Sequence, residues 1–515
     1  MHMKTTTLIR KMSFPALIAL CFGMGGCNDF LERSAQNLVI PTTCADYTEI
    51  LQGEGYFGNL IREGVWVNLM TDDMEMFTPQ YDNTLPFNLN NYRYVYQWRD
   101  EIEIEDESFE DELFNFLYSQ ILVANTCIDA LDQGLEGTPD EQDILRGQAL
   151  FHRAFAYLML ANLYAEPYDL ATSETPCVPL KTDPTPSLQP YERATFAEVY
   201  KQIDDDITEG LAALKGKDTG NYYYIGYNAM LFVAMRKALY TNDFDAAIEY
   251  GKEILEANDA LFDITDRIQS VAPGEINGSD AYDNFMQPAN PELMFCFASA
   301  TTTISNLISR SNNLEQTFTL SRTIDNNLIG LYDYDTTTCI GDHRLAYWFI
   351  APHEAPGELY HKRGNYYALK FNSYDDLYMR AAFRSAEAYV TLAEAYARKE
   401  NPDYATALDY VNHLRRYRLD AQAYEELTPA DFAGGEEIVQ FIWDERRREL
   451  CGEEFHRFFD LRRTTRAEVI HPYGNAGYYR LEKDDAAYTL NFPLAERQIN
   501  PQNVNPRPVR AMISY

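Results

Sequence analysis

The sequence predicts a mainly α-helical protein with long irregular loops and a few short strands. Three observations support this prediction. Apolar residues recur at helical spacing over much of the chain, one helical pattern occurs twice, and other segments are rich in Thr, Ser, Asn, Asp, Gly and Tyr. Apolar residues three and four positions apart share one face of a helix, whereas runs of small polar residues are typical of loops.

Five helices are expected in the first half of the chain. The clearest start signal is Thr195-Phe196-Ala197-Glu198. It is a capping box, in which the Thr and Glu side chains accept hydrogen bonds from free N–H groups of the first turn. Apolar stripes at helical spacing predict the others. The expected helices lie at 113–128, 145–164, 195–214, 227–240 and 245–255.

One helical pattern is repeated. Residues 243–250 resemble residues 403–410, and each segment follows an alanine-rich or aromatic helix, at 230–240 and 386–398. An aromatic residue, then Ala three positions on, then a second aromatic residue is the second-helix pattern of tetratricopeptide units. The small Ala allows paired helices to approach closely. The alternative is a chance similarity between two short amphipathic helices, which share the same period.

Long segments between the helices show no helical period. Residues 71–94, 264–378 and 471–515 are expected to be irregular, with short β-type runs such as 293–297. Long irregular segments in a compact protein are usually functional. The expected regions are helical repeats at about 108–260 and 380–465 and a loop-rich region at about 264–378.

The chain is strongly acidic. Its 515 residues include 79 Asp and Glu against 43 Lys and Arg, a net charge of -36. Such a protein is repelled by nucleic-acid phosphates, so no nucleic-acid partner is expected. An acidic surface first of all keeps a protein dispersed, and a neutral or cationic ligand suits it better than an anionic one.

The N-terminus carries an export signal. Basic residues precede an apolar run at 12–22 that is too short to span a bilayer. Met24-Gly25-Gly26-Cys27 resembles the lipobox of bacterial lipoproteins. Residues 1–26 are therefore expected to be a signal peptide, with Cys27 lipidated as the first residue of the mature chain. The alternative is an ordinary signal peptide followed by a chance cysteine.

No metal or other cofactor is expected. His343, His353 and His361 fall in one loop, but no H-E-x-x-H helix brings them together. The cysteines beyond Cys27 are scattered and contain no C-x-x-C pair, so a zinc site is not indicated. They are Cys44, Cys127, Cys177, Cys296, Cys339 and Cys451.

Seven short motifs occur in a fixed order along the chain. They are 27–32; 117–121 with Ala124 and Asn125; 146–154; 328–332 with 342–344; 384–389 with 393–395; 443–450 with Glu454, Arg457, Asp460, Leu461 and Arg463; and 493–506. In this order they resemble the SusD/RagB family of nutrient-binding outer-membrane lipoproteins. Phe455 departs from the family pattern, which usually has Gly at that position.

The resemblance implies that 27–515 form a single ligand-binding domain with a SusD-like fold, in which helix pairs of tetratricopeptide type carry a ligand-binding face of loops. It implies a non-enzymatic protein that faces the cell exterior, anchored to the outer membrane through its lipid. It also implies a SusC-like TonB-dependent transporter as partner. Ligands of the family are mostly glycans and in some members peptides, and the sequence does not separate the two.

Aromatic residues are the best candidates for ligand contact. Tyr92, Tyr94, Tyr96 and Trp98 alternate at strand spacing, which places the four rings on one face. A flat aromatic face can stack on a sugar ring, although packing against helices is an equal alternative. Trp66 and Phe318 are similar candidates, and Asp73, Asn91 and Arg310 can orient hydroxyl groups. The candidate ligand-binding residues are Trp66, Asp73, Asn91, Tyr92, Tyr94, Trp98, Arg310 and Phe318.

No catalytic residues are expected. The carboxylates and arginines at 445–463 are interpreted as structural ion pairs, because carboxylates paired with Arg stay ionised and make poor general acids. Phosphate-binding, dinucleotide and α/β-hydrolase motifs are missing from the sequence. A hydrolase remains an alternative, because two glycosidase carboxylates need no motif. An adaptor scaffold is a further alternative, since tetratricopeptide arrays often serve as one.

Overall fold

The computed structural model describes most of the chain from Pro41 onward, and Thr43–Tyr515 form one unit. Cys27, Asn91 and Arg310 lie outside the described residues. The described ranges are 41–77, 92–105, 109–186, 189–217, 220–265, 285–286, 289–298, 317–335, 338, 340–350, 367–368, 379–474 and 476–515.

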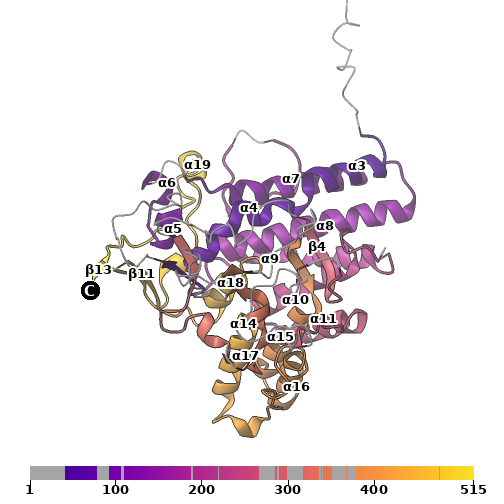
Figure 1. Cartoon of the computed structure of the whole chain (residues 1–515). Helices are drawn as coiled ribbons and strands as arrows, with labels where there is room; N and C mark the ends of the chain where they lie inside the picture. Colours follow the sequence, from indigo (N-terminus) through magenta and orange to yellow (C-terminus); the bar gives the residue numbers. More distant parts are fainter. Residues whose placement is uncertain are drawn as a thin grey trace, which may run out of the picture. The chain divides into compact units, whose positions relative to one another are not determined.

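Helices dominate the described residues, as predicted (Figure 1). Each of the five helices expected in the first half is present. Capping boxes at Thr138 and Thr195 start two of them, because the hydroxyl of each Thr accepts a hydrogen bond from the N–H three residues on. The long helices are α7 (Glu112–Asp132), α8 (Pro139–Tyr164), α9 (Phe196–Leu214), α10 (Tyr227–Tyr240), α11 (Phe244–Ala257), α15 (Ser385–Arg398), α16 (Tyr404–Arg415), α17 (Gly435–Leu450) and α18 (His456–Arg463).

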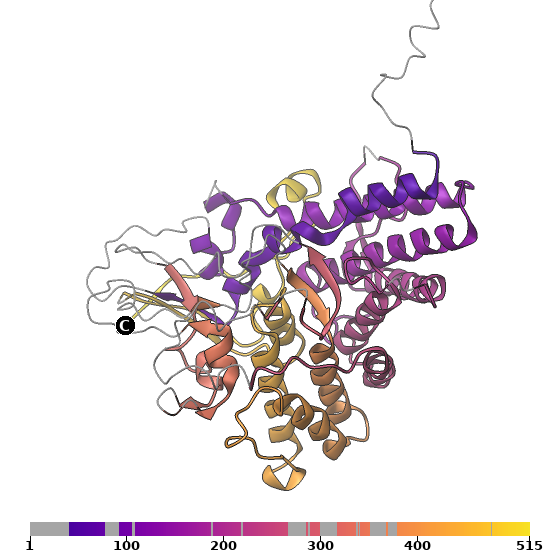
Figure 2. The same ribbon diagram turned by 45° about the vertical axis from the view of Figure 1, so that its right-hand side comes forward.

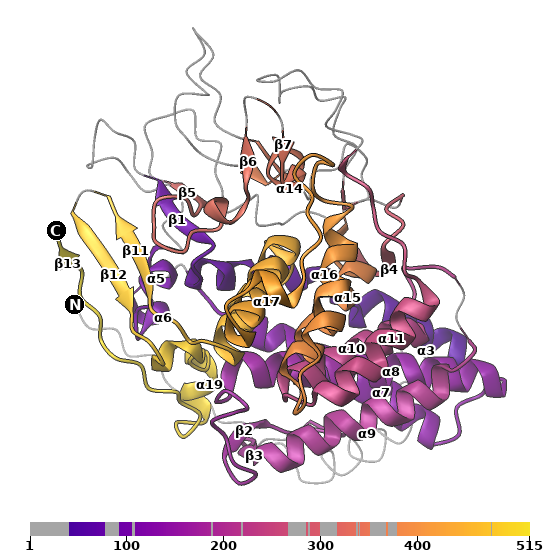
Figure 3. The same ribbon diagram turned by 90° about the horizontal axis from the view of Figure 1, so that it is seen from below.

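The long helices stack in one array. Each of α7 to α11 packs on the next, α11 then packs on α15, and α15 packs on α16 and α17 (Figures 2 and 3). Glycines allow the close approach at two of these contacts. A Cβ atom on Gly147 would lie 2.4 Å from Leu214 Cγ, and one on Gly251 would lie 2.9 Å from Leu392 Cδ2. The second contact joins the two halves of the array across more than a hundred residues of chain.

The repeated pattern forms equivalent helices in adjacent pairs, α10–α11 and α15–α16. Ala247 and Ala407, the central residues of the pattern, are both fully buried. The aspartates at the start of each repeat are helix caps. Asp243 Oδ1 accepts a hydrogen bond from the N–H of Ala246 at 3.2 Å, and Asp403 Oδ1 accepts one from the N–H of Thr406 at 3.0 Å. Equivalent packing and equivalent caps favour a true repeat over chance similarity.

Short antiparallel strands lie beside the helices. The expected strand at 293–297 is confirmed as β4 (Leu293–Ala298), which pairs with β10 (Met379–Arg384). Part of 471–515, expected to be irregular, forms a sheet of β11 (Val469–Tyr473), β12 (Gly477–Leu481) and β13 (Ile513–Ser514). The other pairs are β1 (Met74–Phe77) with β5 (Thr317–Leu320), β2 (Pro176–Pro179) with β3 (Arg193–Thr195), β6 (Tyr334–Asp335) with β7 (Ile340–Gly341), and β8 (Phe349–Ile350) with β9 (Tyr367–Ala368).

Shorter helices connect these elements. Figure 3 shows α5 next to β1 and β11, at the end of the molecule where β12 and β13 also lie. The shorter helices are α3 (Cys44–Ile50), α4 (Leu60–Gly64), α5 (Arg93–Tyr96), α6 (Ile102–Glu105), α14 (His343–Trp348) and α19 (Leu494–Ile499).

The charged residues of α17 form a buried ion-pair network, as the sequence predicted. Glu449 contacts Arg384 Nη1 at 2.7 Å, Arg418 Nη2 at 2.9 Å and Arg344 Nη1 at 3.1 Å, and all four side chains are fully buried. Burial opposes ionisation of Glu445, but Arg344 and other guanidinium groups outweigh it and lower the pKa of Glu445 to about 2. These carboxylates are therefore ionised and connect helices rather than transfer protons.

Phe455, the departure from the family pattern, is fully buried against a glycine. A Cβ atom on Gly64 would lie 2.4 Å from Phe455 Cζ, so the ring fills the space above this glycine at the end of α4. The preceding residue, Glu454, has a φ of 43°. The left-handed conformation that the turn needs is therefore adopted by Glu454, and a large residue can follow it.

A buried histidine on α8 makes stability depend on pH. His152 is stacked on Phe57 with ring centroids 5.0 Å apart, and neither ring nitrogen has a hydrogen-bond partner within the described part of the chain. Burial lowers the pKa of His152 to about 3. The unfolded chain binds this proton near pH 6.5, so the stabilising contribution is complete above pH 6.5 and is lost as the pH falls toward 3.

We expect His152→Phe to reduce acid destabilisation. Between pH 7.5 and pH 5, wild type should lose about 2 kcal/mol more of its free energy of unfolding than the variant. His471, whose pKa burial lowers to about 4, and Asp111, whose pKa burial raises to about 7, are present in both proteins and cancel in the comparison. Urea unfolding at the two pH values measures the difference. Equal losses in both proteins would contradict the assignment.

Candidate functional site

The aromatic residues at 92–98 do not form a strand, so that prediction is wrong. Residues 93–96 form the short helix α5, and Trp98 follows it with a φ of 48°. The helical turn and the left-handed residue direct Tyr96 and Trp98 inward. Their rings enclose His471 from both sides, with centroids 4.1 and 3.9 Å from the imidazole. Tyr92 and Tyr94 remain half-buried.

Two further candidates, Asp73 and Phe318, lie in the core. Asp73 is buried, and its Oδ1 accepts a hydrogen bond from Arg447 Nε at 2.7 Å. Phe318 is fully buried beside Tyr96, with ring centroids 5.2 Å apart. Neither side chain, nor Trp98, is accessible to a ligand in this structure.

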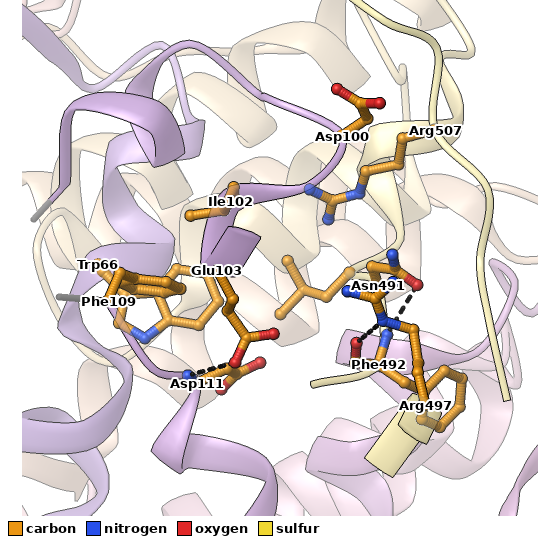
Figure 4. A pocket seen from close by; sticks show the side chains of 11 residues that line it. Trp66, Asp100, Ile102, Glu103, Phe109, Asp111, Asn491, Phe492, Arg497 and Arg507 are labelled. Carbon is orange, nitrogen blue, oxygen red and sulfur yellow. Dashed lines mark hydrogen bonds between the residues drawn. The ribbon is translucent and has the colours of Figure 1, made fainter. Parts of the chain in front are cut away.

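Trp66 borders a small cavity and is otherwise buried. The indole packs edge to face on Phe109 with centroids 5.3 Å apart, and Figure 4 shows both rings on one wall with Arg507 across from them. Glu103 and Asp111 lie between these walls. The cavity has a volume of about 30 Å³, which is enough for water molecules but not for a sugar ring. Trp66 therefore has a packing role here.

The carboxyl group of Asp111 is held on this cavity wall by the start of α7. Asp111 caps the helix by accepting a hydrogen bond from the N–H of Leu113, and Tyr164 donates its hydroxyl to Asp111 Oδ2 at 2.8 Å. Burial raises the pKa of Asp111 to about 7, and these hydrogen bonds only partly oppose the rise. Because Asp111 caps α7 and accepts a hydrogen bond from Tyr164, we assign this carboxyl group a structural role.

The best candidate for ligand contact is a tyrosine–arginine cluster, defined as Arg93, Tyr94, Arg99, Tyr473 and Tyr479. Arg93 donates a hydrogen bond to the Tyr94 hydroxyl at 2.8 Å. The Arg99 guanidinium lies 5.8 Å from the Tyr94 ring and 5.7 Å from the Tyr479 ring. Tyr473 meets Tyr479 edge to face at 5.6 Å. Helix α5 and strands β11 and β12 thus contribute to one cluster.

The cluster is partly open to solvent. Arg93, Tyr94, Arg99 and Tyr473 are half-buried, and Tyr479 forms the buried base. Arg99 Nε lies 3.7 Å from Glu105 Oε2, whereas within the described residues no carboxylate lies within 4.0 Å of the Arg93 guanidinium. Burial opposes this charge, but hydrogen bonds to Tyr94 and Tyr473 outweigh it and raise the pKa of Arg93. The rings offer apolar contact, and the hydroxyl and guanidinium groups offer directed donors.

The sequence predicted only one member of this cluster, Tyr94. Tyr473 and Tyr479 belong to a segment that was expected to be irregular, and the chain brings them beside α5 only through the β11–β12 hairpin. The available signal was the density of tyrosine at 473–479, where three of seven residues are Tyr. Tyrosine is enriched in β-strands, so this density favours a strand there.

Other chemistry has little support among the described residues. They contain no cluster of three or more His, Cys, Asp or Glu side chains suited to a metal ion. His343 is buried, with Nε2 3.7 Å from Asp420 Oδ2, while His353 and His361 lie outside the described ranges. None of the helices in the described ranges has the length and apolar character needed to cross a membrane. The described cysteines Cys44, Cys127, Cys177, Cys296 and Cys451 are buried and form no disulfide with one another.

Sequence comparison identifies the family from both ends of the chain. A family described as "Starch-binding associating with outer membrane", of SusD-like type, matches residues 29–225, and the SusD family matches residues 356–511. The chain belongs to the SusD/RagB family. No curated protein matches the sequence.

Solved structures of SusD proteins share the fold. A SusD superfamily protein from Bacteroides thetaiotaomicron superposes with a TM-score of 0.66 at 18% identity, covering 90% of this chain and 100% of that one. A SusD-like carbohydrate binding protein from Bacteroides vulgatus gives 0.63 at 18%, covering 90% and 98%. A SusD superfamily protein from Bacteroides fragilis gives 0.64 at 20%, covering 91% and 100%. The predicted SusD-like fold is thereby confirmed.

Proposed function

We propose that this SusD-family protein captures a glycan at the cell surface without converting it, and delivers it to a SusC-like TonB-dependent transporter in the outer membrane. Membership of the family carries this proposal. The tyrosine–arginine cluster supports it, because an open arrangement of rings and neutral or cationic donors suits hydroxyl-rich ligands. One of the structural relatives is described as a carbohydrate binding protein.

A peptide ligand is the second candidate. Backbone carbonyl groups accept hydrogen bonds from guanidinium and hydroxyl donors as sugar hydroxyls do, and tyrosine packs on apolar side chains. The cluster therefore supports either ligand, and binding experiments must separate them. A scaffold or a hydrolase would need a partner surface or a catalytic pair, and the carboxylate of Glu105 beside the cluster is paired with Arg99 Nε at 3.7 Å.

The proposal includes a lipid anchor. Residues 1–26 would be removed, Cys27 would carry the acyl chains, and 27–515 would be the ligand-binding domain facing the exterior. We expect Cys27→Ala to abolish outer-membrane attachment, because the acyl chains supply the membrane affinity. Cell fractionation with radiolabelled palmitate measures both attachment and lipidation. A variant that still sediments with outer membranes would contradict the anchor.

We expect Tyr94→Ala to weaken ligand binding by about tenfold or more, because a well-covered ring contributes on the order of 1–3 kcal/mol. The probes are soluble starch, inulin, xylan, galactan, mannan and a casein digest, tested by affinity electrophoresis and calorimetry. A glycan retained by wild type and released by Tyr94→Ala supports the proposal. Product formation from any probe by the purified protein would contradict it.

Tyr478→Ala is the matched control. Tyr478 is also half-buried and lies on the same sheet, but neighbouring residues of a strand point to opposite faces, so it lies away from Tyr479 and the cluster. Its ring instead meets Tyr515 at 5.8 Å. Equal losses of affinity in both variants would exclude the cluster as the site. Retention of the casein digest alone would favour the peptide ligand.

A further inference from the structure

A cleft opens beside the first turns of α9. It is built by elements that do not contribute to the tyrosine–arginine cluster. It has a volume of about 230 Å³, which is room for one sugar ring. Its floor is aromatic. Phe196 and Tyr200, one helical turn apart, stack with centroids 5.7 Å apart, and Tyr168 meets Tyr200 at 4.8 Å. The lining residues are Tyr168, Ala171, Thr172, Ser173, Phe196, Ala197 and Tyr200.

The rim of this cleft is held in place before any ligand arrives. The backbone N–H of Phe196 donates to the Thr175 carbonyl at 2.9 Å, and that of Ala197 donates to the Ser173 carbonyl at 3.1 Å. Asp169, next to Tyr168, is paired in two contacts with Arg466 at 2.9 Å. A preformed rim lowers the entropic cost of binding, so even a small ligand can be retained.

Large apolar side chains are nevertheless exposed at this rim. Tyr168 is 38% exposed and Leu170, two residues further along the chain, is 52% exposed, whereas Phe196 and Tyr200 are buried. An aromatic ring left partly in water over an aromatic floor leaves one surface available for stacking. Sugar rings stack on such surfaces through their C–H groups.

The lining is free of charge, which is unusual on a chain of net charge -36. None of the lining residues is a carboxylate or a cation. A cationic ligand would therefore lack a counter-charge inside the cleft, and an anionic ligand would lack a donor cation. Thr172 and Ser173 place hydroxyl groups at the edge. Thr172 Oγ1 bonds to Thr175 Oγ1 at 3.0 Å and Ser173 Oγ donates to Glu174 Oε1 at 3.3 Å, and the remaining lone pairs of both hydroxyl groups can accept from sugar hydroxyls.

We propose that this cleft is a second binding site that takes a single neutral pyranose unit. The inference rests on the proposed glycan-binding function, and it adds a one-ring site on α9 separate from the tyrosine–arginine cluster. A protein with two separated sites holds a polymer more tightly than either site alone, because the second contact forms at a high effective concentration.

The experiment uses the full mature protein and the methyl glycosides of glucose, galactose, mannose and xylose. Saturation-transfer NMR detects binding at millimolar concentrations. We expect one glycoside to receive saturation at its ring C–H protons and Tyr168→Ala to weaken its binding about tenfold or more. Tyr168→Phe should retain it, because the ring and not the hydroxyl makes the contact. Tyr478→Ala should leave it unchanged, because Tyr478 lies outside both the cluster and this cleft.

Several outcomes would overturn the inference. They are the failure of every glycoside to bind wild type, a loss with Tyr94→Ala instead of Tyr168→Ala, or a loss with Tyr168→Ala that is explained by a lower melting temperature. If only the second site is wrong, the protein still retains a glycan polymer, and Tyr94→Ala still abolishes that retention. Failure of the proposed function removes glycan retention altogether.

Discussion

Glu449→Gln is expected to lower the free energy of unfolding by about 3–5 kcal/mol. Glu449 is fully buried and its two carboxylate oxygens contact Arg384, Arg418 and Arg344 at 2.7 to 3.1 Å. Those arginines come from β10, the segment after α16, and α14. Removing the negative charge leaves buried guanidinium groups with less compensation, and a buried charge without its partner is strongly destabilising. The amide also cannot accept as many hydrogen bonds as the carboxylate.

Glu426→Gln is the matched control for this variant. Glu426 makes the same kind of pair, with Arg416 Nη2 at 2.7 Å, but both side chains are more than half exposed. Exposed pairs contribute about 0–1 kcal/mol, so this variant should be close to wild type. Urea unfolding followed by far-ultraviolet circular dichroism compares the two. A loss of less than 1 kcal/mol in Glu449→Gln would show that neighbouring carboxylates compensate the network.

Trp98→Ala is expected to cost about 3–5 kcal/mol of stability, as large aromatic truncations in a core do. Trp98 is fully buried, stacks on His471 at 3.9 Å, and donates its indole N–H to the Met70 carbonyl at 3.1 Å. Truncation opens a cavity, and it also leaves the Met70 carbonyl without this donor. The loss of hydrogen bonding adds to the loss of packing.

Binding and stability separate the roles of Trp98 and Tyr94. Trp98→Ala should lower the melting temperature and keep its affinity for a retained glycan in the folded fraction, whereas Tyr94→Ala should show the reverse pattern. A Trp98→Ala protein with wild-type melting and lost binding would return this residue to the ligand site. Calorimetric melting beside affinity electrophoresis measures both quantities on the same samples.

The conformation of the aromatic segment at 92–98 could not be predicted from the local sequence. Strand-like alternation of rings was real in the sequence, yet the backbone forms a helical turn and a left-handed residue there. The ring that decides the burial of Tyr96 and Trp98 belongs to His471. His471 and Tyr96 are joined by a hydrogen bond between groups 375 residues apart in the chain. No local pattern contains a contact of that separation.

By itself, the sequence determined the helices, the repeat and the family, because each depends on neighbouring residues. Apolar period, capping boxes such as that of Thr195, and ordered motifs are readable within a few turns of chain. The paired charges of α17 were also predictable, since carboxylates and arginines occur together in that segment.

Only the tertiary structure decided which aromatic and charged groups are accessible. Trp66, Asp73, Trp98 and Phe318 are buried by segments distant in sequence, while Tyr473 and Tyr479 join Tyr94 through the β11–β12 hairpin. The neutral cleft on α9 likewise needs the loop after α8 to fold back over it. Exposure is a property of the whole packed chain, because a side chain leaves water only when other segments cover it.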